Sequence, residues 1–383
     1  MDKALFFKGN FGLERETLRV GSEGRLAQTP HPFGDDESIT RDFCENQIEL
    51  ITPVCKSVNE MMSELERLDK TVRAELAKNG ESIWLYSNPP HFDDESEIPV
   101  ANFTGEHFGK RKYREQLERR YGKRLMLFSG IHFNFSFDDE YLKSFLGEDI
   151  GGKKRDEFYL KLYKQLSRYS WLLLLLTAAS PFYDGSLFGE DGGVKQSPYA
   201  SIRSGERGYW NETQPILRYE SLKDYVESIE EYVKKGILFS ASELYLPVRL
   251  KPKGVNTLEN FKNGVSHIEL RMFDIDPTKP LGVDSNDLEF AHLFLMYLSK
   301  QNDYDFDEIL QRKAVDDHKK AAFYDLDNIE IDGVPITDRA NALLDDVAAF
   351  FEGETQALDI IKYEKNKLRN RTSHRIKKED IYG

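Results

Sequence analysis

Apolar residues recur every three or four positions in several stretches of the chain, a spacing that predicts amphipathic helices. In the first such stretch, 56–79, the apolar positions are Val58, Met61, Met62, Leu65, Leu68, Val72 and Leu76. Further helices of this kind are expected at 154–179, 221–236 and 287–300, and helical patterning returns from Arg339 to about Leu368.

The most apolar run of the chain lies between Trp171 and Ala179 and includes five consecutive leucines. A membrane-spanning helix needs about 20 apolar residues, so this run is too short to cross a bilayer. We interpret it as the buried end of a helix that stops at Ser180-Pro181.

Four other stretches, 12–18, 45–51, 131–137 and 267–272, alternate apolar and polar residues with a period of two. Successive side chains of a strand point to opposite faces, so each stretch predicts a strand with one apolar and one polar face. The polar faces carry Glu14 and Glu16; Glu45, Gln47 and Glu49; His132, Asn134 and Ser136; and His267, Glu269 and Arg271.

An antiparallel sheet with one solvated side would explain the alternation by itself. An ordinary solvated face carries mixed charges, however, whereas these faces are rich in carboxylates. Carboxylates on neighbouring strands repel each other. Divalent cations bound between their oxygens would remove that repulsion, so we favour a metal-binding sheet face.

The chain has 383 residues, with 67 acidic and 53 basic residues and a net charge of −14. This balance argues against nucleic-acid binding, which needs basic patches. The acidic excess is typical of a solvated surface and also compatible with a cation site. The two cysteines, Cys44 and Cys55, form no metal-ligand or disulfide pattern. Residues 1–8 lack the apolar core of a signal peptide, so we expect a cytoplasmic protein.

Carboxylates with one histidine and no cysteine cluster suit Mg²⁺ or Mn²⁺ better than zinc. The chain contains neither a G-x-x-x-x-G-K-[ST] phosphate-binding loop nor a Rossmann glycine fingerprint. Any phosphate would therefore be bound by metal ions and arginines, for which Arg271, Arg114 and Arg203 are the candidates.

Two other enzyme classes are disfavoured. A nucleophilic cysteine needs a neighbouring base and a lowered pKa, and Cys44 falls on the apolar face of its predicted strand. A glycosidase would use one pair of carboxylates without a metal, and nothing distinguishes such a pair among the five or more available here.

The polar strand faces belong to longer motifs that resemble the bacterial glutamate–cysteine ligases. The resemblance runs in order from about residue 10 to about 300. Its main blocks are Phe11-Gly12-Leu13-Glu14-Arg15-Glu16-Thr17-Leu18, Asp42-Phe43-Cys44-Glu45, Ile48-Glu49-Leu50-Ile51-Thr52-Pro53, Tyr113-Arg114, Ser129-Gly130-Ile131-His132-Phe133-Asn134-Phe135-Ser136, Tyr199-Ala200-Ser201-Ile202-Arg203, Gly208-Tyr209, Glu243-Leu244-Tyr245-Leu246-Pro247-Val248-Arg249 and Ile268-Glu269-Leu270-Arg271-Met272-Phe273-Asp274-Ile275-Asp276-Pro277.

The resemblance implies an α+β fold akin to glutamine synthetase, a funnel made by a curved, mostly antiparallel sheet with helices outside. It implies a single ligase domain over 1–383, with a core at about 10–300 and a helical C-terminal extension at 301–383. It also implies that ATP phosphorylates the γ-carboxyl of glutamate, that the amine of cysteine attacks the acyl phosphate, and that ADP and phosphate leave, as the first step of glutathione biosynthesis. Phosphoryl transfer asks the protein mainly for positioning and charge neutralisation.

The resemblance also implies roles for individual residues. Arg271 and Arg114 match positions that meet the transferred phosphate. The matches to Mg²⁺ or Mn²⁺ ligands are Glu14, Glu16, Asp42, Glu49, His132 and Glu269. The matches to the amino-acid pocket are Tyr113, Arg203, Tyr209 and Tyr245. An arginine is a suitable partner for a substrate carboxylate because its planar fork binds both oxygens.

The chain departs from the family pattern in three places. The segment Trp84-Leu85-Tyr86-Ser87-Asn88-Pro89 has Asn88 where the family has methionine, the segment between Asp184 and Tyr199 is short, and the part after about residue 300 is short and poorly matched. These departures leave open a ligase for a different amine. A catalytically inactive binding protein on the same fold is a further alternative.

The last part of the chain is unusually basic for so acidic a protein. Between Lys365 and Lys378 lie seven basic residues. Such a run is most often a solvated terminal tail. The alternative hypothesis is a lid whose arginines reach the ATP phosphates and exclude water from the acyl phosphate.

Overall fold

The computed structural model describes residues 3–382 and is built around one seven-stranded sheet. The strand order is β2-β3-β1-β5-β9-β8, β4 pairs with β1, and every pairing is antiparallel. The strands are β1 (Gly9–Val20), β2 (Ile39–Arg41), β3 (Gln47–Ile51), β4 (Ser82–Trp84), β5 (Ile131–Phe137), β8 (Val248–Pro252) and β9 (Val265–Phe273). Two small hairpins lie outside this sheet: β6 (Phe182–Asp184) with β7 (Val194–Gln196), and β10 (Glu330–Ile331) with β11 (Val334–Pro335).

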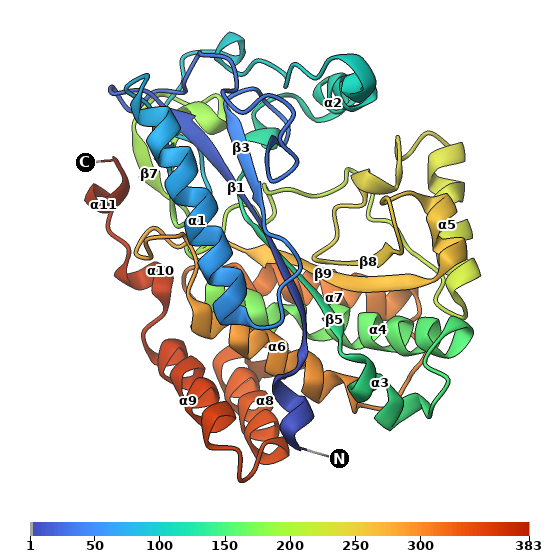
Figure 1. Ribbon diagram of the computed structural model, residues 1–383. Helices are drawn as coiled ribbons and strands as arrows, with labels where there is room; N and C mark the ends of the chain where they lie inside the picture. The colour runs from blue at the N-terminus through green and yellow to red at the C-terminus, as the bar shows by residue number, and fades with distance from the viewer. Residues whose placement is uncertain (1–2, 383) are drawn as a thin grey trace.

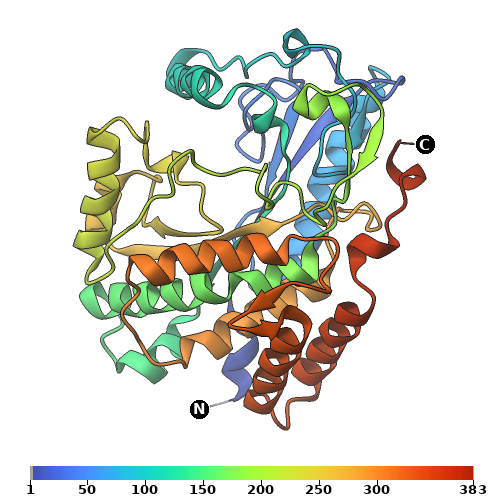
Figure 2. The same cartoon turned by 180° about the vertical axis from the view of Figure 1, so that it is seen from behind.

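Long helices pack against one face of the sheet, as Figures 1 and 2 show from opposite sides. α1 contacts β1, β3 and β4, α4 contacts β8 and β9, and α6 contacts both of these helices. The helices are α1 (Val58–Ala77), α2 (Phe108–Tyr121), α3 (Asp139–Leu146), α4 (Gly152–Thr177), α5 (Leu222–Lys234), α6 (Ser285–Ser299), α7 (Glu308–Ala321), α8 (Ile336–Phe350), α9 (Thr355–Arg369), α10 (Thr372–Arg375) and α11 (Glu379–Tyr382).

The alternating strands place their apolar residues in the main core under these helices. The core residues from the sheet include Leu13, Ile48, Leu50, Phe133, Phe135, Ile268 and Leu270. Burial of these side chains leaves the opposite, polar face of the same strands free to form a site. The α+β fold with a largely antiparallel sheet and outer helices is therefore confirmed.

Helix α4 contains the leucine run, whose five leucines are buried in the core. The helix ends at Thr177, directly before the segment Ser180-Pro181, as the sequence predicted. Among the residues that the structure describes, no helix combines the length and apolar character that a membrane span requires.

The helices differ from the expectation in two respects. The predicted helical stretch from Arg339 to Leu368 is interrupted, because Gly353 adopts a φ of 85° between α8 and α9, a conformation that glycine favours. The helices α2 and α3 were not predicted, whereas α7 falls within the helical extension expected at 301–383. α2 escaped prediction because only Leu117 of its fourteen residues is buried, so it has almost no apolar periodicity.

The basic C-terminal segment contacts the core of the structure. The Lys367 ammonium makes a buried ion pair with Asp287 of α6, and the Arg371 guanidinium donates hydrogen bonds to the backbone oxygens of Phe323 and Tyr324. Among the described residues after position 300, none lines the cavity described below. These contacts attach the C-terminal helices to the core, and the lid that closes over bound ATP stays a prediction.

Candidate active site

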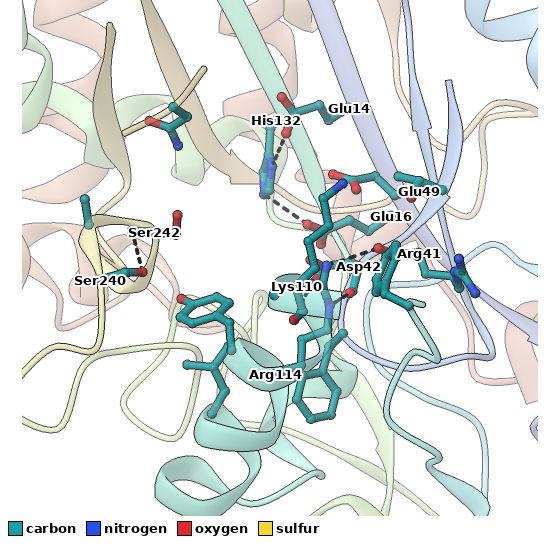
Figure 3. A pocket seen from close by; sticks show the side chains of 18 of the residues that line it. Glu14, Glu16, Arg41, Asp42, Glu49, Lys110, Arg114, His132, Ser240 and Ser242 are labelled. Atoms are coloured by element: carbon teal, nitrogen blue, oxygen red, sulfur yellow. Dashed lines mark hydrogen bonds and ion pairs between the residues drawn. The ribbon is translucent and has the colours of Figure 1, made fainter. Parts of the chain in front are cut away.

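The polar face of the sheet borders a cavity of about 1060 Å³. Helix α2 lines one wall with Lys110, Tyr113 and Arg114, and the segment after α5 lines another with Ser240 and Ser242 (Figure 3). The sheet itself contributes Glu14, Glu16, Glu49, His132, Arg249, Lys251, Glu269 and Arg271.

Strand register brings the sheet residues together from distant parts of the sequence. Glu14 lies opposite His132, Glu16 lies opposite Glu49, and Asn134 lies opposite Glu269. The pairing of β5 with β9 shifts between Ile131 and Phe133, around His132, which marks a β-bulge. Bulges of this kind re-aim side chains and are frequent next to active sites.

Glu14, His132 and Glu269 form a group of side chains that could hold a metal ion. One ligand atom from each lies within 4.8 Å of the other two. The His132 Nδ1 lies 3.0 Å from Glu14 Oε2 and 4.0 Å from Glu269 Oε1, and its Nε2 lies 3.5 Å from Glu16 Oε1 (Figure 3). Among the described residues His132 Nε2 is buried without a hydrogen-bond partner, so it is available to a ligand. These donors fit a hard divalent cation.

Two acidic residues of this face favour the protonated form in the absence of a cation. Burial raises the pKa of Glu16 to about 8, and the nearby charge of Asp42 adds to the effect. Burial also raises the pKa of Glu49 well above its usual range, again with a contribution from Asp42. A bound dication would lower both values by favouring the ionised carboxylates.

His132 and Glu14 already have the charge states that metal binding requires. Burial and, to a smaller extent, the charge of Arg271 lower the pKa of His132 to about 4, so the imidazole is neutral at pH 7. Burial would raise the pKa of Glu14, but the hydrogen bond with His132 and the charges of His132 and Lys251 together outweigh it and leave the pKa below its usual value. The Asn134 amide donates to Glu14 Oε1 at 3.1 Å and orients this carboxylate.

Glu269 is fully buried and surrounded by three cations. Its Oε1 lies 2.9 Å from the Lys251 ammonium, and its Oε2 lies 3.4 Å from Arg271 and 4.0 Å from Arg249. Despite the cost of burial, these charges hold the pKa of Glu269 well below its usual range. The charge of Glu269 in turn raises the pKa of Arg271, so the two groups favour each other's ionised form.

Arg114 and Asp42 lie at the opposite side of the metal-ligand group, where α2 meets the end of β2. Arg114 donates to the backbone oxygens of Asp42, of Arg41 at 3.2 Å and of Lys110 at 3.0 Å (Figure 3). Its guanidinium also stacks over the Phe103 ring at 4.7 Å. The side chain therefore lines the cavity in a fixed position, and a phosphate would have to replace some of these carbonyl contacts.

Three of the four residues predicted for the amino-acid pocket line the cavity, namely Tyr113, Tyr209 and Tyr245. The rings of Tyr209 and Tyr245 pack with their centroids 4.2 Å apart. Arg203 lies beneath them, along a small cavity of about 30 Å³ that both tyrosines also line. Its guanidinium donates to the backbone oxygens of Arg271 and Phe273, and its Nε has no partner.

Several polar residues of the predicted strands lie outside the site. Glu45 accepts hydrogen bonds from the backbone amides of His31 and Asn102, and Gln47 accepts one from Phe43, so both hold loops in place. Burial raises the pKa of the Cys44 thiol far above neutrality, which agrees with its rejection as a nucleophile.

Sequence reasoning missed the two basic residues that β8 contributes, Arg249 and Lys251. The signal was present, because Val248-Arg249-Leu250-Lys251 alternates like the other strands. Arg249 entered only as part of a family motif and Lys251 was not considered. The unusual Asn88 also has a clear place: its amide donates to the backbone oxygens of Ser180 and Phe182, away from the cavity lining.

Comparison with known proteins gives a consistent result. The family description "Glutamate-cysteine ligase" matches residues 1–320. The chain is 38% identical over 320 residues to the glutathione biosynthesis bifunctional protein GshAB of Clostridium perfringens, covering 78% of this chain and 41% of that protein. It is 34% identical over 375 residues to the glutamate–cysteine ligase of Clostridium acetobutylicum, covering 83% of this chain and 77% of that protein. It thus spans about two fifths to one half of the bifunctional relatives that it matches.

Solved structures agree with this comparison. The glutamate–cysteine ligase of Francisella tularensis in complex with AMP superposes with a TM-score of 0.84 at 25% identity, covering 96% of this chain and 84% of that one. The bifunctional glutathione synthetase of Pasteurella multocida superposes with a TM-score of 0.83 at 29% identity, covering 97% of this chain and 49% of that one. The chain belongs to the glutamate–cysteine ligase family.

Proposed function

We propose that the protein catalyses the ATP-dependent ligation of the γ-carboxyl of glutamate to the amine of cysteine, as the first step of glutathione biosynthesis. The observation that carries this proposal is the convergence of Glu14, His132 and Glu269 next to Arg271 at the floor of one cavity. A buried cluster of metal ligands beside fixed cations is what phosphoryl transfer to a carboxylate requires.

The cation in this proposal is Mg²⁺ or Mn²⁺, bound by Glu14, Glu16, Asp42, Glu49, His132 and Glu269. Bound divalent cations neutralise the charge of the triphosphate and polarise the transferred phosphoryl group. Neutral His132 offers a nitrogen lone pair, and Asn134 orients the carboxylate of Glu14. The raised pKa values of Glu16 and Glu49 fit carboxyl groups that become ionised when a cation binds.

The basic residues act on the anionic groups of the reaction. Arg271, ionised and fixed beside Glu269, stabilises the negative charge on the transferred phosphoryl group and on the resulting γ-glutamyl phosphate. Arg114 does the same from the opposite wall. The acceptor amine then attacks the acyl carbon and phosphate departs with the bond electrons, which yields the γ-glutamyl amide, ADP and phosphate.

The amino-acid substrates bind between α2 and the tyrosine pair. Tyr113, Tyr209 and Tyr245 supply an apolar surface with hydroxyl groups, and Arg203 supplies a cation for a substrate carboxylate. An uncharged aromatic wall of this kind suits a small side chain such as that of cysteine. Amines other than cysteine remain the main alternative for the acceptor.

The decisive experiment is a panel of amines and amino acids with ATP, Mg²⁺ and glutamate, monitored by ADP release and by mass spectrometry of the product. We expect the highest kcat/KM with cysteine and a product with the mass of γ-glutamylcysteine. A higher kcat/KM with another amine would reassign the acceptor. An absence of ADP release with every amine, together with retained ATP binding in a thermal-shift assay, would favour an inactive binding protein.

A further inference from the structure

Lys251 of β8 is the nearest cation to the fully buried Glu269. Its ammonium lies 2.9 Å from Glu269 Oε1, the same oxygen that lies 4.0 Å from His132 Nδ1. This oxygen therefore faces both the candidate metal-ligand group and the lysine. A dication bound by Glu269 and an ammonium at 2.9 Å from the same oxygen repel each other, so their contacts with Glu269 Oε1 oppose each other.

The other two cations around Glu269 are held by different groups and cannot move as easily. Arg249 donates through Nε and Nη2 to the backbone oxygens of Leu244 and Ser242. Arg271 lies on the same strand as Glu269 and contacts both Glu269 and His132. Lys251 has Glu269 as its one close ionic partner among the described residues.

The side chain of Lys251 borders open space into which it can move. It lines the cavity and is 14% exposed, whereas Glu269 is completely buried. Lysine has a flexible four-carbon stem with a compact charge at its end. When it leaves Glu269 its ammonium stays in the cavity, where the oxygens of an anionic ligand such as a polyphosphate can replace the carboxylate as its partner.

We propose that Lys251 is an exchangeable counter-cation of Glu269, which couples the binding of the divalent cation to the binding of the nucleotide polyphosphate. Without a polyphosphate, the lysine opposes a dication at Glu269. With a polyphosphate in the cavity, the lysine moves to the phosphate oxygens and leaves Glu269 to the metal. Lys251 is thus a positioning residue that favours joint over separate binding, and this inference rests on the proposed ligase function.

The test is a Mn²⁺ titration followed by electron paramagnetic resonance, with and without the non-hydrolysable analogue AMP-PNP. Mn²⁺ bound by AMP-PNP alone is subtracted by a titration without protein. In the absence of AMP-PNP we expect Lys251→Met to bind Mn²⁺ on the order of tenfold more tightly than the unmodified protein, because one positive charge near the metal is removed. The factor by which AMP-PNP tightens Mn²⁺ binding should fall severalfold, whereas Lys251→Arg should keep most of it.

The matched control is Lys253→Met, which removes the same charge two residues further along, at an exposed position outside the cavity. It should leave Mn²⁺ binding within about twofold, because solvent screens its charge. Equal Mn²⁺ affinity of Lys251→Met and the unmodified protein would overturn the inference, as would an equal gain in the Lys253→Met control. If the unmodified protein binds no Mn²⁺ with or without AMP-PNP, the proposed function itself fails. Lys251→Gln serves as a second variant if Lys251→Met does not give the circular dichroism spectrum of the unmodified protein.

Discussion

Glu16 of β1 and Glu49 of β3 lie directly opposite each other in the antiparallel sheet, and both border the cavity. Burial raises the pKa of each carboxyl, that of Glu16 to about 8. Two like charges opposite each other destabilise a sheet. The pair therefore lowers the free energy of unfolding when no ligand is bound. In the proposed function the ligand that offsets this cost is a divalent cation.

Replacing Glu49 by glutamine should stabilise the protein when no metal is present and weaken its response to metal. We expect Tm in EDTA to rise by about 1–3 °C, because folding no longer has to bury or protonate a carboxyl that is ionised in the unfolded chain. The increase of Tm on adding Mg²⁺ should shrink. Differential scanning fluorimetry measures both values. Glu148→Gln, at an exposed position paired only with Lys143, is the control and should change neither. A lower Tm of Glu49→Gln in EDTA would contradict this explanation.

Glu269→Gln should lower kcat for ADP formation by at least about 100-fold, which corresponds to about 2.7 kcal/mol of activation free energy. The variant loses a charged carboxylate oxygen that would bind the metal. It also leaves Arg271, Arg249 and Lys251 without their shared anion. It should therefore also unfold at a lower urea concentration, in contrast to a change that affects the metal alone. A variant within threefold of the original kcat would refute the assignment of Glu269 as a ligand.

Gly130→Ala should displace Arg203. A Cβ atom on Gly130 would lie 2.5 Å from the Arg203 guanidinium, closer than any real contact. If Arg203 binds a substrate carboxylate, kcat/KM for the amino acid that it holds should fall at least about tenfold while KM for ATP changes less than about twofold. Gly12→Ala is the control, since its Cβ would meet Asn134 at an ordinary 3.6 Å. Equal losses in both variants would indicate a general effect on the sheet.

Lys367→Met should destabilise the protein without changing the amount of product formed per ADP. Its ammonium is buried beside Asp287 and Glu364, and its removal leaves two carboxyls without a counter-charge. Breaking such a pair costs about 3 kcal/mol, which urea unfolding can measure. Lys362→Met, at an exposed position of the same helix, is the control. A normal stability with a reduced product yield per ADP would support the lid hypothesis for the C-terminal segment.

Asp284 should contribute to stability in acid. Burial by itself would raise its pKa, but hydrogen bonds from Lys279 and Tyr363 outweigh this effect and lower the pKa to about 2. A folded-state pKa below the unfolded value means that the contribution is complete above about pH 4 and is lost as the pH falls towards 2. Asp284→Asn should therefore cost about 1 kcal/mol at pH 6, allowing for solvent screening, and should have a flatter stability profile between pH 4 and 2. Urea unfolding at a series of pH values would show a parallel profile if this assignment is wrong.

The sequence by itself determined the local features of the fold and most of the candidate ligands. Alternation with a period of two placed Glu14 and Glu16, His132, and Glu269 and Arg271 on polar strand faces, because the direction of a strand side chain depends only on its own position. Helical periodicity located α1, α4, α5 and α6 because each has an apolar face to bury.

Tertiary structure alone decided what pairs with what. Helix α2 could not be recognised because only one of its residues is buried, which leaves almost no apolar periodicity. The register that sets Glu16 against Glu49, and the approach of Lys251 to Glu269, join residues from separate strands. The ion pair between Lys367 and Asp287 crosses 80 residues of chain and changes a basic tail into a structural attachment. Such contacts depend on how complete elements pack, and that information is spread over the whole chain and absent from any single stretch of it.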